Sequence, residues 1–230
     1  MDGNEKITSR ERLLLAGLKI FAEKGYAHAT FKDICEESQS NIASINYYFR
    51  DKERFYLEIL SFALERRRRV MQECWELVPK APWKALRRHI EILLESTYTE
   101  VERQCHWLFL RYLIDYESMP HIEMRESKDS ESPRVVYENR MTALMRALLG
   151  ETASTAKNIS LLRYTYYSLS HYLLIHTRQE ERCRDGKFNV HNYADREEVV
   201  AYICNIVRDT VKRMKQEASR AAKPGPSANK

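Results

Sequence analysis

Glycine and proline are scarce in this chain of 230 residues, which contains six of each. Long stretches instead place apolar residues three and four positions apart, the spacing of one face of a helix. Together these two features predict an all-α fold. The length is sufficient to bury a core, either as one large domain or as two modest ones.

The sequence also lacks a long apolar run. No stretch approaches the length needed to cross a bilayer, and the charged start, MDGNEKITSRER, does not resemble a signal peptide. The five cysteines are odd in number and never spaced as CxxC, which favours reduced, structural thiols. We therefore expect a cytoplasmic protein without a membrane partner.

Catalytic signatures are missing as well. The chain contains no glycine-rich phosphate loop, nucleophile elbow, HExxH motif or EF-hand pattern. His171 and His176 are five positions apart, so they do not share a helix face well enough to predict a zinc pair. The sequence thus predicts a protein that is not an enzyme and has no cofactor or metal.

Charge permits a nucleic-acid partner without requiring one. The formal net charge is +5, but residues 1–60 hold nine Lys and Arg against ten Asp and Glu. DNA binding by this part must therefore depend on where the cations lie. The arginine run at 66–69 follows about fourteen residues after Lys52, roughly 20 Å along a helix, which favours a solvated helix face over a DNA contact.

Residues 30–52, TFKDICEESQSNIASINYYFRDK, predict two short helices joined by a tight turn. Thr30 and Asp33 have the spacing of a capping box, and Asn41 is suited to cap the second helix. Ile45 and Phe49 share one face of that second helix. Small, amide and aromatic side chains then point outward, an arrangement suited to the DNA major groove.

Several motifs in order carry a family resemblance. RERLL at 10–14, IFAEKGY at 20–26, Thr30 with Asp33-Ile34, and INYYF at 45–49 followed by Lys52-Glu53 resemble the N-terminal DNA-binding domain of the TetR/AcrR family. The resemblance covers about the first quarter of the chain. One departure lies in the turn, where Ser38-Gln39-Ser40 stands in place of the usual Ala-Gly-Val, so a non-glycine residue is expected to adopt a left-handed conformation.

The resemblance implies roles for individual residues of this N-terminal domain, residues 1–52, which we call the head. The expected base-facing residues are Ile42, Ala43, Ser44, Asn46 and Tyr47, and the expected phosphate-binding residues are Thr30, Tyr48 and Lys52. Asn46 has the amide geometry for paired hydrogen bonds to adenine. The alternative for Tyr47 and Tyr48 is that they merely pack the helix onto its neighbour.

The remaining sequence predicts a larger helical domain. We place the helix-turn-helix domain at 1–52, a connector helix at 52–77, an effector-binding and dimerisation domain at 53–218 and a disordered tail at 219–230. Within the larger domain, helices are expected over 83–101, 105–116, 133–149, 156–179 and 195–218. The last two have wide apolar faces, which predict a homodimer through a four-helix bundle, as the resemblance also implies.

An aromatic and methionine-rich middle region predicts a cavity for a small apolar or aromatic effector. The expected pocket residues are His89, Trp107, Tyr112, Met141, Met145 and Tyr166. The alternative for each is ordinary core packing. The family resemblance implies an effector pocket but transfers no particular pocket residue.

The resulting hypothesis is a dimeric transcriptional regulator, a repressor released from a palindromic operator by a small molecule. Two rivals are an architectural or nucleoid-associated DNA-binding protein without an effector, and a small-molecule-modifying enzyme on a helical bundle. The first predicts weak sequence discrimination and a packed core, and the second requires turnover of a bound compound.

Overall fold

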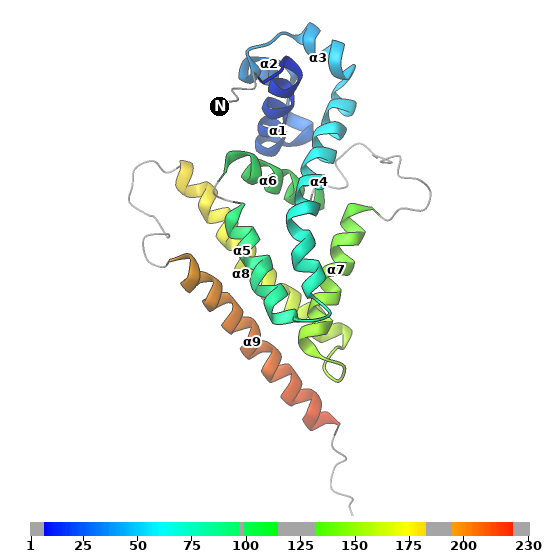
Figure 1. The fold of residues 1–230 in the computed structure, drawn as a ribbon, viewed down its shortest axis with the longest axis vertical. Coiled ribbons are helices and arrows are strands. Elements are labelled where there is room, and N and C mark those ends of the chain that lie inside the picture. The colour runs from blue at the N-terminus through cyan, green and yellow to red at the C-terminus, as the bar shows by residue number, and fades with distance from the viewer. Residues whose placement is uncertain (1–6, 97–98, 115–131, 183–194, 223–230) are drawn as a thin grey trace, which may run out of the picture. The chain divides into compact units, whose positions relative to one another are not determined.

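The computed structural model describes residues 7–96, 99–114, 132–182 and 195–222, with residues 171–182 described by their backbone alone. All regular structure in these ranges is helical, which confirms the all-α prediction (Figure 1). The helices are α1 (Ser9–His28), α2 (Phe31–Ser38), α3 (Ile42–Phe49), α4 (Lys52–Leu77), α5 (Pro82–Glu95), α6 (Glu100–Ile114), α7 (Pro133–Leu149), α8 (Ala156–Arg182) and α9 (Arg196–Ala221).

The chain divides into two compact units, and α4 contributes to both. The first unit comprises Met1–Val70 and Tyr98–Arg134, and the second comprises Met71–Thr97 and Val135–Lys230. The first unit includes α6 as well as the N-terminal helices, because α6 packs against α1 and supplies Cys105, Leu108 and Tyr112 to its core. Helices α1 to α3 bury little apolar surface by themselves, and residues of α4 and α6 enlarge that core.

Side-chain caps set the starts of the N-terminal helices. Thr8 and Glu11 form a capping box at α1, and Thr30 and Asp33 form the expected one at α2. Asn41 Oδ1 accepts from the Ser44 amide at 2.9 Å, as the sequence predicts for α3. Each cap satisfies amides that have no partner within their own helix.

The predicted helix over 83–101 is wrong, because the chain forms two helices there. Helix α5 ends at Glu95, and Ser96 Oγ donates to the Leu93 carbonyl at 2.6 Å. Thr99 Oγ1 then accepts from the Glu102 amide at 3.3 Å at the start of α6. The spacing of Thr99 and Glu102 is that of a capping pair, a signal that the apolar periodicity obscured.

In the second unit, α5 contacts both α8 and α9, and α8 contacts α9. Ion pairs between Arg87 and Glu197 and between Arg196 and Glu95 join α5 to α9. Helix α7 ends as predicted before Gly150, whose φ of 70° favours glycine. Helix α9 extends to Ala221, so the first residues of the expected tail are helical; residues 223–230 lie outside the described residues.

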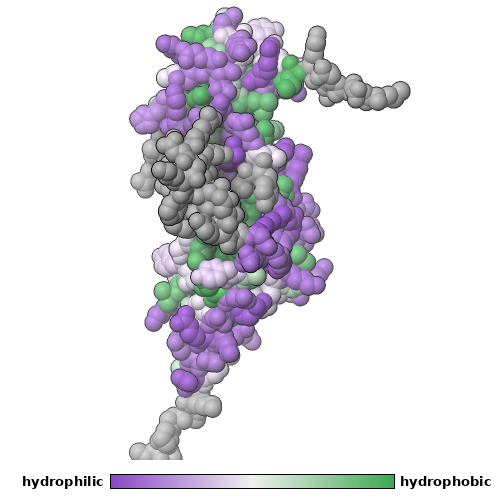
Figure 2. All heavy atoms as spheres, turned by 90° about the vertical axis from the view of Figure 1, so that its left-hand side faces the viewer, coloured by the Kyte–Doolittle hydropathy of each residue, from purple (hydrophilic) through white to green (hydrophobic). Residues whose placement is uncertain are grey.

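The described surface is predominantly polar on the face shown in Figure 2, where hydrophobic residues form small separate areas among hydrophilic ones. None of the described helices is long and apolar enough to span a membrane. The described cysteines, Cys35, Cys74, Cys105 and Cys204, are free thiols; Cys183 lies outside the described residues. Burial raises the pKa of Cys105 to about 12, which keeps its thiol protonated.

Candidate nucleic-acid interface

Helix α3 is fixed by two side chains on its inner face. Ile45 is 0% exposed and Phe49 is 3% exposed, and both belong to the core of the first unit. The Phe49 ring stacks on Phe55 of α4 with 4.2 Å between ring centroids. These contacts fix the rotation of the short helix about its own axis. That rotation determines which of its residues face solvent.

The outer face of α3 carries most of the expected base-facing residues. Tyr47 is 81% exposed and Ile42 is 50% exposed. Ala43 and Asn46 are also exposed. Ser44 is half-buried, and its hydroxyl donates to Asn41 Oδ1 at 3.1 Å, within the cap of the helix. The face therefore combines one amide, one phenol and small side chains, the chemistry that reads base edges.

The two tyrosines of α3 differ in exposure. Tyr48 is 39% exposed, and its ring meets that of Tyr47 edge-on with 5.0 Å between centroids. Tyr48 also lies 6.0 Å from the buried Phe49 ring. Part of the Tyr48 side chain is therefore covered by packing against neighbouring rings, whereas Tyr47 projects into solvent.

The turn between α2 and α3 uses a non-glycine residue in the left-handed region, as predicted. Gln39 has φ 52° and ψ 43°, and its amide donates to the carbonyls of Cys35 and Glu36. Ser38 is buried and its hydroxyl donates to the Ile34 carbonyl at 2.7 Å. These hydrogen bonds satisfy the end of α2 and offset the cost of the left-handed residue.

The expected phosphate-binding residues lie at helix starts. Thr30 Oγ1 accepts from the Asp33 amide at 3.1 Å, within the capping box at the start of α2. Lys52 begins α4, and its ammonium nitrogen lies 4.6 Å from the centroid of the Tyr26 ring. Burial lowers the pKa of Lys52 from its ordinary value. A lysine beside the amides of a helix start is suited to bind a phosphate.

Several cations of the head are engaged with carboxylates. Lys24 pairs with Asp33 at 2.7 Å, Lys19 pairs with Glu37 at 2.7 Å, and Arg10 pairs with Glu58. Hydrogen bonds from Lys24 and Thr30 lower the pKa of Asp33 to about 2. These pairs engage cations of α1, whereas Lys52 at the start of α4 lies against the Tyr26 ring.

One further basic residue lies near this face. Arg50 directly follows α3, is exposed and has φ 67°. Its amide donates to the Asn46 carbonyl at 3.1 Å, so the backbone turns immediately after the outer face. The signal in the sequence is a cation placed one residue beyond the INYYF motif.

The expected effector residues divide between the two units. His89 and Tyr166 are 0% exposed, and His89 Nδ1 is hydrogen-bonded to the Tyr166 hydroxyl. Met141 and Met145 are also fully buried in the second unit. Tyr112 belongs to the core of the first unit, and Trp107 is partly buried against that core.

Two further aromatic residues join the His89 and Tyr166 pair. The Trp75 ring lies 5.4 Å from the His89 ring and 6.2 Å from the Tyr137 ring, measured between centroids. Tyr137 was not among the expected pocket residues, because its position early in α7 gave no signal beyond ordinary helical spacing. The second unit thus contains an aromatic cluster formed by α4, α5, α7 and α8.

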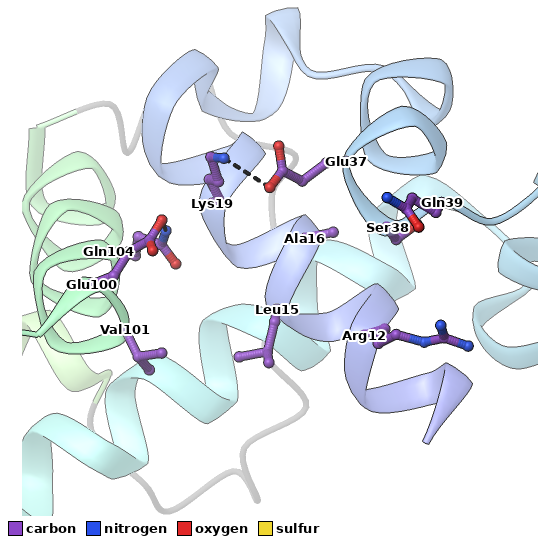
Figure 3. A pocket seen from close by; sticks show the side chains of 10 residues that line it. All are labelled: Arg12, Leu15, Ala16, Lys19, Glu37, Ser38, Gln39, Glu100, Val101 and Gln104. Atoms are coloured by element: carbon purple, nitrogen blue, oxygen red, sulfur yellow. Dashed lines mark hydrogen bonds and ion pairs between the residues drawn. The ribbon is translucent and has the colours of Figure 1, made fainter. Parts of the chain in front are cut away.

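A polar hollow of about 320 Å³ lies within the first unit, lined by residues of α1, α2 and α6 (Figure 3). Its polar walls include the Lys19–Glu37 ion pair and a hydrogen bond from Gln104 to Glu100 at 2.9 Å. A second hollow of about 540 Å³ is lined by apolar residues of α1 and α4, including Leu14, Ile59 and Phe62. Neither contains an expected effector residue, and the described residues hold no cluster of metal ligands.

Comparison with known proteins agrees with the geometry of the head. Residues 13–59 match the family model described as bacterial regulatory proteins, tetR family. A comparison with curated proteins found no match. The matched segment runs from the middle of α1 into α4 and therefore includes the whole of α2, the turn and α3.

Two solved structures are similar over most of their length. A candidate TetR-family transcriptional regulator from Mesorhizobium loti MAFF303099 is 14% identical, with a TM-score of 0.43 over 91% of this chain and 96% of that chain. A candidate transcriptional regulator from Rhodococcus sp. RHA1 is 17% identical, with a TM-score of 0.37 over 89% and 98%. Likenesses this weak support no conclusion about function. The family match and the helix-turn-helix geometry together identify residues 13–59 as a DNA-binding domain of the kind found in bacterial regulatory proteins of the tetR family.

Proposed function

We propose that this DNA-binding regulator is a repressor that binds a palindromic operator as a homodimer and is released by a small molecule. The single observation that carries the proposal is the outer face of α3. Asn46 and the 81% exposed Tyr47 project outward while Ile45 and Phe49 anchor the helix in the core. A helix anchored in this way presents the same side chains to every base pair it meets.

In this proposal, direct readout and positioning fall to different residues. Asn46 pairs with an adenine edge, while Ile42, Ala43, Ser44 and Tyr47 contact neighbouring bases. Thr30, Tyr48 and Lys52 bind phosphates and set the register of α3 on the duplex. The position of Lys52 at the first turn of α4 supports this division, since a helix start favours an anion.

Dimerisation is assigned to α8 and α9. Leu161 and Tyr164, three positions apart on α8, are 44% and 70% exposed, and Tyr202 on α9 is 64% exposed. Large apolar side chains exposed on adjacent helices are typical of a protein interface. A second copy that covers them by two-fold symmetry would present two reading helices about 34–36 Å apart, or a multiple of that distance, on the duplex.

The effector is assigned to the aromatic cluster around His89 and Tyr166, with Met141 and Met145. A hydrogen-bonded polar pair within an apolar surround is typical of sites for small aromatic ligands. These side chains are tightly buried, so a ligand must displace them, and its binding energy must differ between two conformations to change DNA affinity.

Selection from randomised DNA tests the first part of the proposal. The full chain should enrich fragments with an inverted repeat, and enrichment without sequence preference would indicate an architectural DNA-binding protein instead. A Tyr164→Glu, Tyr202→Glu variant should then be monomeric and lose the preference for paired half-sites. Sedimentation of the wild-type chain as a monomer at micromolar concentration would refute the dimer.

The effector is tested with the same selected duplex. Small aromatic compounds that raise the melting temperature of the chain should also raise its dissociation constant for the duplex. The matched control is a Tyr166→Phe variant, which keeps the ring and removes the hydroxyl bonded to His89. Compounds that bind tightly but leave the dissociation constant unchanged would contradict the repressor mechanism.

A further inference from the structure

The part of α1 that ends at the break at Gly25 is held by an arginine from α6. Arg111 Nε donates to the Ala22 carbonyl at 2.9 Å, and Arg111 Nη2 donates to the Glu23 carbonyl at 2.8 Å. The final carbonyls of a helix lack the amide of the residue four positions ahead. The guanidinium supplies donors to two of them, and its positive charge is favourable at the negative end of the helix dipole.

Gly25 makes this approach possible. Its φ of 75° and ψ of 169° interrupt the helix immediately after the two bonded carbonyls. A Cβ at this position would lie 3.0 Å from Arg111 Nη1, so the guanidinium lies directly against the glycine. The conformation of this break and the position of Arg111 are therefore linked.

The residue after the break holds Lys52. The Tyr26 ring packs against Phe21, with centroids 6.4 Å apart, and meets the Tyr56 ring edge-on at 5.0 Å. The Lys52 ammonium nitrogen lies 4.6 Å from the Tyr26 centroid, within the range of a cation–π interaction. Tyr26 thus restricts a lysine that would otherwise sample many rotamers at the start of α4.

We propose that Arg111 is a positioning residue for DNA binding, which fixes the break at Gly25 and thereby the Tyr26 ring that orients Lys52. The inference rests on the proposed phosphate contact of Lys52. When Arg111 is removed, the end of α1 loses two hydrogen-bond donors and the backbone of Gly25 and Tyr26 gains freedom. Lys52 is then no longer held where a phosphate lies, so its phosphate contact is lost from the complex, although Arg111 does not touch DNA.

The test measures the dissociation constant of a duplex selected by the wild-type chain from randomised DNA, over a series of salt concentrations. Loss of one phosphate contact reduces the slope of log affinity against log salt by about one, and we expect about a tenfold loss of affinity at low salt. Arg111→Met and Lys52→Met should both show this change. The double variant should bind no more weakly than the weaker single variant, because both substitutions remove the same contact.

Arg66→Met is the matched control, since it removes an ion pair to Glu102 that also joins α4 to α6. Its affinity and slope should equal those of the wild-type chain. Arg111→Lys keeps the charge but donates from one nitrogen, so it should recover only part of the affinity. If Arg111→Met does not fold, as judged by circular dichroism, Arg111→Lys and Tyr26→Leu provide the same comparison of slopes.

Failure of this inference is distinct from failure of the proposed function. A slope that depends on Lys52 but is unchanged in Arg111→Met and Arg111→Lys would overturn the inference alone. Additive losses in the double variant would have the same meaning, since they would show that the two residues act separately. If Lys52→Met had the same slope as the wild-type chain, Lys52 would not contact a phosphate. The inference would then have no basis.

Discussion

The outer face of α3 and the arginine run of α4 differ in a way that net charge does not reveal. The α3 face has no lysine or arginine, yet Asn46 and Tyr47 project into solvent. The run at 66–69 has four consecutive arginines, but Arg68 and Arg69 both pair with Glu65, at 2.7 and 2.9 Å. The two surfaces therefore differ in how many side chains are free of partners on the described residues of α3 and of the run, and the count of cations does not show this difference.

The other two arginines of the run are engaged within the first unit. Arg66 pairs with Glu102 of α6. The Arg67 guanidinium carbon lies 4.1 Å from the Phe109 centroid, and Arg67 Nη1 donates to His106 Nδ1 at 2.9 Å. A DNA backbone would have to compete with these partners, so the run is poorly suited to bind phosphates. The expectation of a helix face without a DNA contact is consistent with this pairing.

The largest effect is expected at Asn46. Asn46→Ala removes the amide proposed to pair with adenine and should cost about 1–3 kcal/mol of discrimination between the preferred and a substituted base pair. Binding to non-specific DNA should change little, since phosphate contacts remain. Competition binding with selected and scrambled duplexes measures both quantities. An equal loss on the two duplexes would mean that Asn46 does not read bases.

A substitution at Gly25 tests the break in α1 that packs against Arg111. Gly25→Ala places a side chain at φ 75°, ψ 169° and 3.0 Å from Arg111 Nη1, so unfolding should become easier by about 1–3 kcal/mol. Urea denaturation followed by circular dichroism measures the change. Gly150→Ala is the control. The φ of Gly150 is also positive, but a Cβ added there would lie 3.8 Å from the nearest side-chain atoms, those of Lys215. If Gly150→Ala lowered the free energy of unfolding more than Gly25→Ala, the break in α1 would not be specially sensitive to a side chain.

Local signals predicted the head well, because they operate over a few residues. The Thr30 capping box, the Asn41 cap and the left-handed residue in the turn follow from side-chain chemistry within three or four positions. The alternation of Ile45 and Phe49 with exposed neighbours follows from helix geometry alone. The shape of the candidate reading surface was therefore accessible before the fold was known.

Long-range partners were not accessible in the same way. Apolar residues at helical spacing do not specify which core they join, and the sequence therefore contained no sign that Tyr112 joins the core of the first unit whereas Tyr166 belongs to the second unit. The bonds from Arg111 to Ala22 and Glu23 span almost ninety residues of sequence, and nothing local indicates them. The same reason explains the missed break near Ser96, where continuous apolar periodicity outweighed a short polar signal.

A smaller effect is expected from acid. The pKa of Asp33 lies at about 2, below its ordinary 3.8, because the carboxylate accepts hydrogen bonds from Lys24 and Thr30. The ionised group thus stabilises the fold fully above about pH 4, and this contribution is lost as the pH falls toward 2. Asp33→Asn should show a weaker loss of stability over that interval in urea titrations. Identical curves for both proteins would mean that Asp33 contributes no stability.

The smallest effect is expected from the arginine run. A measurable effect there would contradict the difference described above between the run and the α3 face. Arg68→Gln and Arg69→Gln remove exposed partners of Glu65, and exposed ion pairs contribute little because water screens them and their side chains lose entropy. Urea denaturation and the dissociation constant of the selected duplex should both match the wild-type chain. The slope of affinity against salt is the sharper measure, since two phosphate contacts would lower it by about two. Such a decrease would place the arginines on DNA, and pairing with Glu65 would no longer distinguish the run from the α3 face.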